Sequence, residues 1–260
     1  MAGMFHVKHL WCQTRIRVDP PEFHGERAMS EYQQETLEAT ERTRAEVSRI
    51  LDAFLDRQER PLPADVRHSL VDLAFMLAEW GAGMNLTGHR GPASIMSHLI
   101  CDGLALWGCA RSLVAEERSG PLSDLGAGAG FPGLPVALVE PELQVILVES
   151  RERRHHFQRA ARRKLGLTNL DPRLGRIEEL PPSGSDWVVA QAVAKPDRAL
   201  ALGVPWLNPG GVMLIPGNEP SKEASAHLAI CESGILRYEV PDRRESRWLW
   251  WGRSPFPGGC

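Results

Sequence analysis

The sequence DLGAGAGFPG, residues 124–133, decides the fold expected for this chain. In this stretch Gly126, Gly128 and Gly130 alternate with other residues. A short apolar run precedes them, and a helical pattern begins near Phe131. Glycine tolerates positive φ angles and lets a ligand approach the main chain, and the first turn of a helix offers N–H groups without intrahelical partners. The pattern therefore predicts a strand, a ligand-binding turn and a helix, because a purely structural turn rarely needs three alternating glycines.

Two acidic residues at predicted strand ends indicate which ligand the turn binds. Asp124 ends the strand before the turn, and Glu149 ends the next apolar run, ILVES, where Ser150 follows it. A carboxylate at Asp124 would repel the pyrophosphate that dinucleotide-binding folds hold here, but it suits the ammonium group of S-adenosylmethionine. Glu149 is placed to accept from both ribose hydroxyls, with an exposed strand-end acid as the structural alternative. We therefore expect S-adenosylmethionine as the cofactor.

Short apolar runs alternate with helical stretches after residue 120, which is typical of βαβ units and a parallel sheet. The predicted strands cover residues 122–125, 144–148, 170–174, 187–190, 212–215, 236–240 and 248–251. A short polar turn joins the last two, which indicates a terminal antiparallel hairpin. The expected fold class is α/β, the Rossmann-like seven-stranded sheet of class I S-adenosylmethionine-dependent methyltransferases, with a helical N-terminal extension.

The part of the chain before residue 113 is predicted to be mostly helical. Apolar residues recur at helical spacing from Ser30 to about residue 60, from Ala64 to about residue 83, and over residues 94–107, with Ser30 as the expected first N-cap. Residues 1–29 lack periodicity and predict a disordered tail. The hexapeptide MFHVKH within it can be encoded by a DNA palindrome, so we expect translation to start at Met29. The predicted parts are a tail, 1–29, a helical portion, 30–112, and a methyltransferase domain, 113–260.

Composition and charge restrict the location and the partners of the protein. The five cysteines are scattered without zinc-ligand spacing, so we expect no metal. No secretion signal is recognisable and no apolar stretch approaches the roughly 18 residues of a membrane span, which predicts a cytoplasmic protein without a membrane partner. The net charge of -3 gives no overall attraction to nucleic acid. A local basic patch on the helix after Glu149, with Arg159, Arg162 and Arg163, is the expected RNA contact, although such runs are often only solvated helix faces.

Five short motifs are spread over residues 30–253. They are NLT at 85–87, His98 with Asp102, DLGAGAGFPGLP at 124–135, GRIEEL at 175–180 and AQAVAKP at 190–196. Together they resemble the RsmG (GidB) family, bacterial 16S rRNA guanine nitrogen-7 methyltransferases. The resemblance implies methyl transfer from S-adenosylmethionine to a guanine of the small ribosomal subunit or its precursor, by a protein that we expect to be a monomer.

The resemblance also implies roles for individual residues. Cofactor contacts are expected from four positions: Gly126, Phe131, Ile177 and Glu178. His98 and Asp102 would lie at the mouth of the RNA site, with a simple pair on a helix surface as the alternative. Arg90 and Lys195 are expected to contact phosphates on the same grounds.

Four positions depart from the pattern of that family. Ala127 stands where Ser or Thr is usual, Gly103 replaces the Ser of an HxxDSL motif, and Pro216 occupies the Lys position of a KG pair. Gln191, expected at the catalytic and cofactor site, replaces an Arg and cannot supply its cationic fork. These departures leave two alternatives open: a diverged methyltransferase with another RNA or a small-molecule acceptor, and a non-catalytic RNA-binding relative.

Guanine nitrogen-7 places modest chemical demands on a methyltransferase. It carries an in-plane lone pair and no proton, so alignment and electrostatic support suffice without a general base. Methylation of an exocyclic amine commonly uses a [DNS]PP[YFW] motif, which AQAVAKP does not resemble. Trp248, Trp250 and Trp251 are aromatic side chains on which bases could stack. Alternation along the strand predicts instead that most of them pack in the core.

Overall fold

The computed structural model describes the backbone of residues 26–113, 119–220, 229–240 and 246–258, with side chains from residue 34 onward. Residues 1–25, most of the predicted tail, lie outside the described residues. The chain divides into two units, residues 1–41 and 42–260. Helix α1 (Glu26–Arg57), which begins in the first unit and ends in the second, is already formed at Ser30. The expected N-cap at Ser30 is therefore wrong, because the helix begins at Glu26.

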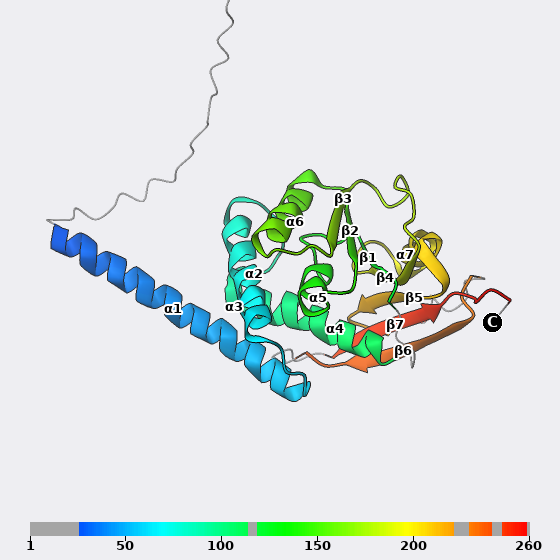
Figure 1. Ribbon diagram of the computed structural model, residues 1–260, viewed down its shortest axis with the longest axis horizontal. Coiled ribbons are helices and arrows are strands. Elements are labelled where there is room, and N and C mark those ends of the chain that lie inside the picture. Colours follow the sequence, from blue (N-terminus) through cyan, green and yellow to red (C-terminus); the bar gives the residue numbers. More distant parts are fainter. Residues whose placement is uncertain (1–25, 114–118, 221–228, 241–245, 259–260) are drawn as a thin grey trace, which may run out of the picture. The chain divides into compact units, whose positions relative to one another are not determined.

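Seven strands of the second unit form one sheet in the order β3-β2-β1-β4-β5-β7-β6 (Figure 1). Strands β1 to β5 are parallel, and β7 runs antiparallel to both of its neighbours, β5 and β6. The strands are β1 (Leu122–Leu125), β2 (Val145–Glu149), β3 (Leu170–Leu174), β4 (Ser185–Ala190), β5 (Leu207–Gly217), β6 (Glu232–Tyr238) and β7 (Arg247–Arg253). All seven predicted strands and the terminal hairpin are confirmed.

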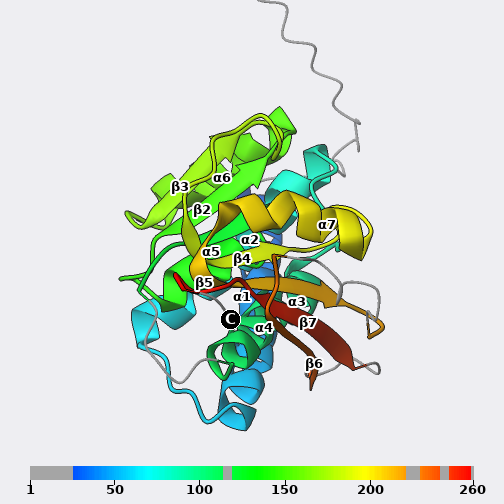
Figure 2. The same ribbon diagram turned by 90° about the vertical axis from the view of Figure 1, so that its right-hand side faces the viewer.

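Helices cover both faces of this sheet. One face packs against α2 (Ala64–Gly83), α4 (Cys101–Arg111), α5 (Gly133–Val139) and α6 (Glu152–Lys164). The other packs against α7 (Pro196–Gly203) and η2 (Val204–Trp206), and Figure 2 shows α7 on the opposite side of β4 and β5 from α4. Because side chains alternate along a strand, Leu122 and Asp124 of β1 face the first layer, while Leu125 faces the second. The carboxyl ends of the parallel strands remain for a ligand site.

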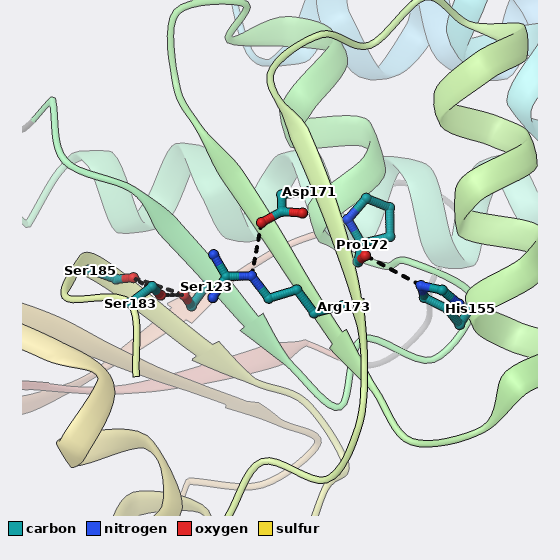
Figure 3. Close-up of polar contacts among 7 residues, drawn as sticks. All are labelled: Ser123, His155, Asp171, Pro172, Arg173, Ser183 and Ser185. Atoms are coloured by element: carbon teal, nitrogen blue, oxygen red, sulfur yellow. Dashed lines mark hydrogen bonds and ion pairs between the residues drawn. The ribbon is translucent and has the colours of Figure 1, made fainter. Parts of the chain in front are cut away.

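Polar contacts fix the start of β4 beside β1 and join α6 to β3 (Figure 3). The Ser123 hydroxyl oxygen lies 2.8 Å from that of Ser185 and 3.1 Å from that of Ser183. Ser123 and Ser185 are fully buried, and buried hydroxyls need such partners. On α6, a ring nitrogen of His155 lies 3.3 Å from the carbonyl oxygen of Pro172. This contact holds the helix that follows β2 against the edge strand.

The predicted helix at residues 94–107 consists of three pieces. α3 (Pro92–Ile95) leads into a π-helical turn, η1 (Met96–Ile100), and then into α4. The Cys101 N–H donates to the Met96 carbonyl, five residues back, so this turn accommodates one residue more than an α-helical turn.

The same stretch, Pro92–Arg111, is long and apolar enough to cross a membrane, contrary to our expectation from the sequence. However, 67% of its apolar window is buried inside the protein. The stretch packs against α2, α5 and β6. Its apolar composition is that of a core element in this fold.

The tryptophans of β7 serve packing. Trp250 is only 2% exposed in the layer of α7, and Trp251 packs against the core on the opposite face. Alternation along the strand predicted this division. Burial therefore excludes Trp250 from a base-stacking platform, while Trp251 is half-buried against the core.

Candidate cofactor and acceptor site

A cavity of about 350 Å³ opens at the carboxyl ends of β1, β2 and β4. Five of the predicted cofactor residues line it: Gly126, Glu149, Ser150, Ile177 and Glu178. Four further lining residues were not among the predicted cofactor contacts: Arg154, Arg198, and Ala192 and Val193 of the AQAVAKP motif. A crevice at this edge of a parallel sheet is the usual place for a ligand in such folds. The structure therefore gathers residues from four separate loops around one space.

The glycine turn has the backbone that its sequence predicts. Gly126, Gly128 and Gly130 have φ angles of +69°, +60° and +97°, which side chains other than glycine rarely adopt. A Cβ atom on Gly126 would lie 2.6 Å from Cγ2 of Val193. Glycine is thus required at residue 126 both for the turn and for the close approach of the loop after β4.

Asp124 is a buried acid behind this turn, only 1% exposed. Its Oδ2 accepts a hydrogen bond from the Gly133 N–H at 2.9 Å, and its Oδ1 is buried without a partner among the described residues. Burial raises the pKa of Asp124 to about 7; the Gly133 hydrogen bond opposes this rise and the charge of Glu149 adds to it. A buried unpaired carboxylate oxygen costs free energy. A cationic ligand group would remove that cost.

Glu149 is held at the end of β2 by its neighbours. Its Oε1 accepts from the Arg151 N–H at 2.8 Å, and its Oε2 lies 3.7 Å from Nη1 of Arg154. Only 4% of Glu149 is exposed, so the alternative of an exposed strand-end acid is wrong. The carboxylate is fixed at the cavity wall, where ribose hydroxyls could donate to it.

The remaining predicted cofactor residues do not line the cavity: Asp124, Gly128, Gly130, Phe131 and Gln191. Gly130 and Phe131 are buried, and the Gly128 carbonyl accepts from Nε2 of Gln158 at 2.9 Å. Gln191 is half-buried and directly follows β4. The next residue, Ala192, lines the cavity with φ +53°, a conformation that is strained for a residue other than glycine.

Asp102 does not face the solvent. It is 4% exposed, and its Oδ1 accepts from the Tyr238 hydroxyl at 3.1 Å and from Nε of Arg247 at 3.3 Å. The alternative of a helix-surface pair is therefore wrong for this carboxylate, and its place at the mouth of the RNA site stays a prediction. The chain has three residues between His98 and Asp102 where the HxxD motif has two. The π-helical turn η1 accommodates the additional residue.

His98 is half-buried one turn before Asp102. Its Nδ1 lies 3.0 Å from the Ser94 carbonyl oxygen, and its ring stacks on that of His89 with centroids 4.8 Å apart. His89 was not among the residues that the sequence indicated, since nothing in its spacing marks it. Whether His98 contacts RNA stays a prediction.

The side chains predicted to contact RNA are all exposed: Arg90, Arg159, Arg162, Arg163 and Lys195. Arg90 donates to the Gly81 carbonyl and to Oδ1 of Asn85. Arg162 donates through Nε to the Leu167 carbonyl at 3.4 Å, so part of its donor capacity is used within the protein. Exposure is necessary for an RNA contact but also fits a solvated helix face.

The cavity fits S-adenosylmethionine in the chemistry of its polar groups. Glu149 on the cavity wall offers a fixed acceptor to ribose hydroxyls. Asp124 lies behind the glycine turn and not among the lining residues, and its unpaired buried carboxylate oxygen suits an ammonium group. A solved structure of similar fold is that of the Bacillus cereus O-methyltransferase in complex with SAH, with a TM-score of 0.51 and 13% identity over 78% of this chain and 97% of that chain. The sheet order and the glycine turn define the protein as a class I methyltransferase, S-adenosylmethionine-dependent as the acidic pair indicates.

Comparison of sequences defines the family. The family model "GidB: rRNA small subunit methyltransferase G" matches residues 67–245. Ribosomal RNA small subunit methyltransferase G of Xanthomonas oryzae is 37% identical over 68% of this chain and 82% of its own length. The enzyme of the same name from Chromohalobacter salexigens is 32% identical over 74% of this chain and 88% of its own length. The chain belongs to the rRNA small subunit methyltransferase G family.

Proposed function

We propose that this protein transfers a methyl group from S-adenosylmethionine to nitrogen-7 of a guanine in 16S rRNA, acting in the cytoplasm as a monomer. The observation that carries the cofactor part is Asp124, a buried carboxylate with one oxygen held by Gly133 and the other without a partner. Membership of the rRNA small subunit methyltransferase G family supports the acceptor.

The chemistry divides simply between the cofactor and the chain. When bound, the cofactor supplies an electrophilic methyl group on a sulfonium centre. The chain contributes binding and orientation: Asp124 receives the ammonium group, Glu149 receives the ribose hydroxyls, and Ile177 and Glu178 border the adenine. No side chain has to remove a proton, because guanine nitrogen-7 has none. The proposal therefore assigns no side chain as a general base.

A second candidate keeps the cofactor and changes the acceptor. Gln191, directly after β4, and Pro216, in β5, stand where the family pattern has cationic residues, which favours a less anionic acceptor than RNA. The test is to offer tritiated S-adenosylmethionine with small subunits from a strain that lacks this methylation, and in parallel with a pool of small metabolites. We expect label only in the RNA. Label only in the small molecules would replace the proposal by the second candidate, and calorimetric absence of cofactor binding would make the chain a non-catalytic relative.

Replacement of Glu149 by glutamine tests the ribose contact. Glu149→Gln keeps the size of the side chain but removes the charge and one acceptor oxygen, so we expect the Kd for S-adenosylmethionine to rise about tenfold. Isothermal calorimetry measures this, with Glu142→Gln on an exposed loop position as the control. An unchanged Kd for Glu149→Gln would remove the ribose role.

The basic face of α6 is the part of the surface that we propose to contact rRNA. The double variant Arg159→Ala, Arg163→Ala removes two exposed charges that lie one helical turn apart. We expect weaker binding to small subunits and a salt dependence of log K that is shallower by about 1.5 units. The control double variant, Arg49→Ala with Arg57→Ala, removes the same charge from exposed positions of α1. Equal effects of the two double variants would argue against a contact specific to α6.

A further inference from the structure

A buried cluster of Asp102, Tyr238 and Arg247 is hydrogen-bonded to one exposed side chain, that of Asn218. Asn218 directly follows β5 and is exposed. Its Oδ1 accepts a hydrogen bond from Nη1 of Arg247. Arg247 begins β7 and is only 7% exposed. An exposed amide is thus tied to a buried cation.

The position of Arg247 is itself fixed from two sides. Its Nε donates to Oδ1 of Asp102 at 3.3 Å, and the Tyr238 hydroxyl donates to the same oxygen at 3.1 Å. Burial alone would lower the pKa of Arg247, but Asp102 and Tyr238 outweigh it and raise the pKa. Arg247 is therefore a charged group with a paired counter-charge, held between α4, β6 and β7. Loss of the Asp102–Arg247 pair is costly, because removing either partner would leave the other charge buried without a counter-charge.

This arrangement fixes which way round the Asn218 amide lies. A guanidinium group can only donate hydrogen bonds, so the oxygen of the amide must face Arg247. The amide nitrogen, with its two donor hydrogens, then faces away from the buried cluster. An exposed asparagine would ordinarily rotate freely, whereas this one presents a donor in a set direction.

The oriented amide lies on the same edge of the sheet as the cofactor cavity. In the parallel pair of β4 and β5, Val189 lies opposite Leu214. Continuing from this register, β4 leads into Ala192 and Val193, which line the cavity, and β5 leads into Asn218. The two strands are direct neighbours (Figure 1). Asn218 therefore follows the strand next to β4, in the register that continues toward Val193 of the cavity lining.

We propose that the amide of Asn218 donates a hydrogen bond to O6 of the acceptor guanine, and that Arg247 and Asp102 position this amide. This inference rests on the proposed function. O6 lies beside nitrogen-7 on the same edge of guanine, where both are acceptors. Adenine carries an amino donor in place of O6, so a donor on the protein would oppose it. Asn218 thereby selects guanine over adenine and aligns nitrogen-7 with the methyl group.

The test changes the atom that Asn218 is proposed to bind. Small subunits are reconstituted with 16S rRNA in which the mapped target guanosine is kept, replaced by inosine, which retains O6, or replaced by 2,6-diaminopurine riboside, which carries an amino group there. For the wild-type protein we expect similar kcat/KM on guanosine and inosine, and a loss of about five- to 150-fold on diaminopurine. Tritium transfer from S-adenosylmethionine provides the rate.

Two variants then assign this discrimination to Asn218. Asn218→Asp keeps an acceptor for Arg247 but has no donor, so the fold is retained while discrimination is lost. Asn218→Ala removes both the acceptor and the donor. In each of the two variants we expect kcat/KM on guanosine to fall to about the value that the wild-type protein shows on diaminopurine. The Kd for S-adenosylmethionine, measured by calorimetry, should stay within about twofold of wild type. Glu219→Ala, at the exposed neighbouring position, is the control and should discriminate as wild type does.

The positioning role of Arg247 has its own readout. Arg247→Lys keeps the charge but not the planar fork, so we expect partial loss of discrimination with an unchanged Kd for the cofactor. If both Asn218 variants discriminate as wild type does, the inference is overturned and the proposed function stands. If the wild-type protein labels no guanine at all, the proposed function fails and the inference fails with it.

Discussion

Asp124→Asn should weaken the binding of S-adenosylmethionine by about 10- to 150-fold, and methyl transfer should become undetectable at ordinary cofactor concentrations. The reason is the loss of the only negative charge that the turn offers to the ammonium group. The amide oxygen of asparagine can still accept from the Gly133 N–H, so the local backbone should hold. Calorimetry gives the Kd, and the control is Asp171→Asn, whose half-buried carboxylate pairs with Arg173 on β3. Wild-type affinity in Asp124→Asn would disprove the ammonium contact.

The raised pKa of Asp124 has a consequence for pH dependence. Its pKa is about 7 in the folded protein and near its ordinary 3.8 when unfolded, so the folded state binds more protons between these values. The free energy of unfolding of the cofactor-free protein should therefore decrease as the pH rises from about 4 to 7. Asp124→Asn should raise the Tm of the cofactor-free protein at pH 8 by about 2 °C or more, because it removes an uncompensated buried charge.

Cofactor binding should depend on pH in the opposite direction. Only the ionised carboxylate attracts the ammonium group, so the Kd of the wild-type protein should rise about tenfold per pH unit below the pKa. Calorimetry between about pH 5 and 7 keeps the cofactor's own α-amino group mostly protonated. In Asp124→Asn the Kd should be flat over this range. A structural role alone would not produce opposite changes in stability and affinity.

Gly133→Ala should both destabilise the protein and weaken cofactor binding. A Cβ atom at residue 133 would lie 2.3 Å from Cδ2 of Leu147 and 3.1 Å from Oδ2 of Asp124. The surrounding residues are buried, and overpacking of this kind costs about 1–3 kcal/mol of unfolding free energy. It also displaces the carboxylate that the Gly133 N–H holds. Denaturant unfolding and calorimetry measure the two effects.

A second substitution separates the two obstacles to this Cβ atom. Leu147→Val removes the methyl group nearest to the added Cβ, so the double variant Gly133→Ala, Leu147→Val should be less destabilised than the sum of the single variants. Cofactor affinity should recover less than stability, because the contact with Asp124 remains. Strict additivity of the unfolding free energies would show that Leu147 is not the obstacle.

The fold could be predicted because its signals are local. The strands are apolar runs bounded by turns, and the alternating glycines with Asp124 and Glu149 all lie within two βαβ units of contiguous sequence. Local pattern is sufficient for such elements, since side-chain alternation and turn chemistry act over a few residues. The cofactor side of the site was predictable for the same reason.

The acceptor side could not be predicted in this way. The partners of Asp102 are Tyr238 and Arg247, and a separation of 145 residues lies between Asp102 and Arg247. Nothing in local spacing reports such a pairing, so the sequence placed Asp102 at the RNA surface. The π-helical turn before it was also missed, because one additional residue in a helix leaves the apolar pattern nearly unchanged. Arg154 reaches the cavity from α6, where its sequence context indicated only a charge run.

The most direct test of the central claim identifies the methylated atom. Small subunits that lack this modification are incubated with the protein and labelled S-adenosylmethionine, the 16S rRNA is digested, and the nucleosides are separated by mass spectrometry. The account predicts a single labelled product, 7-methylguanosine, that forms with the wild-type protein and not with Asp124→Asn. Label in any other nucleoside, or equal labelling by Asp124→Asn, would contradict it.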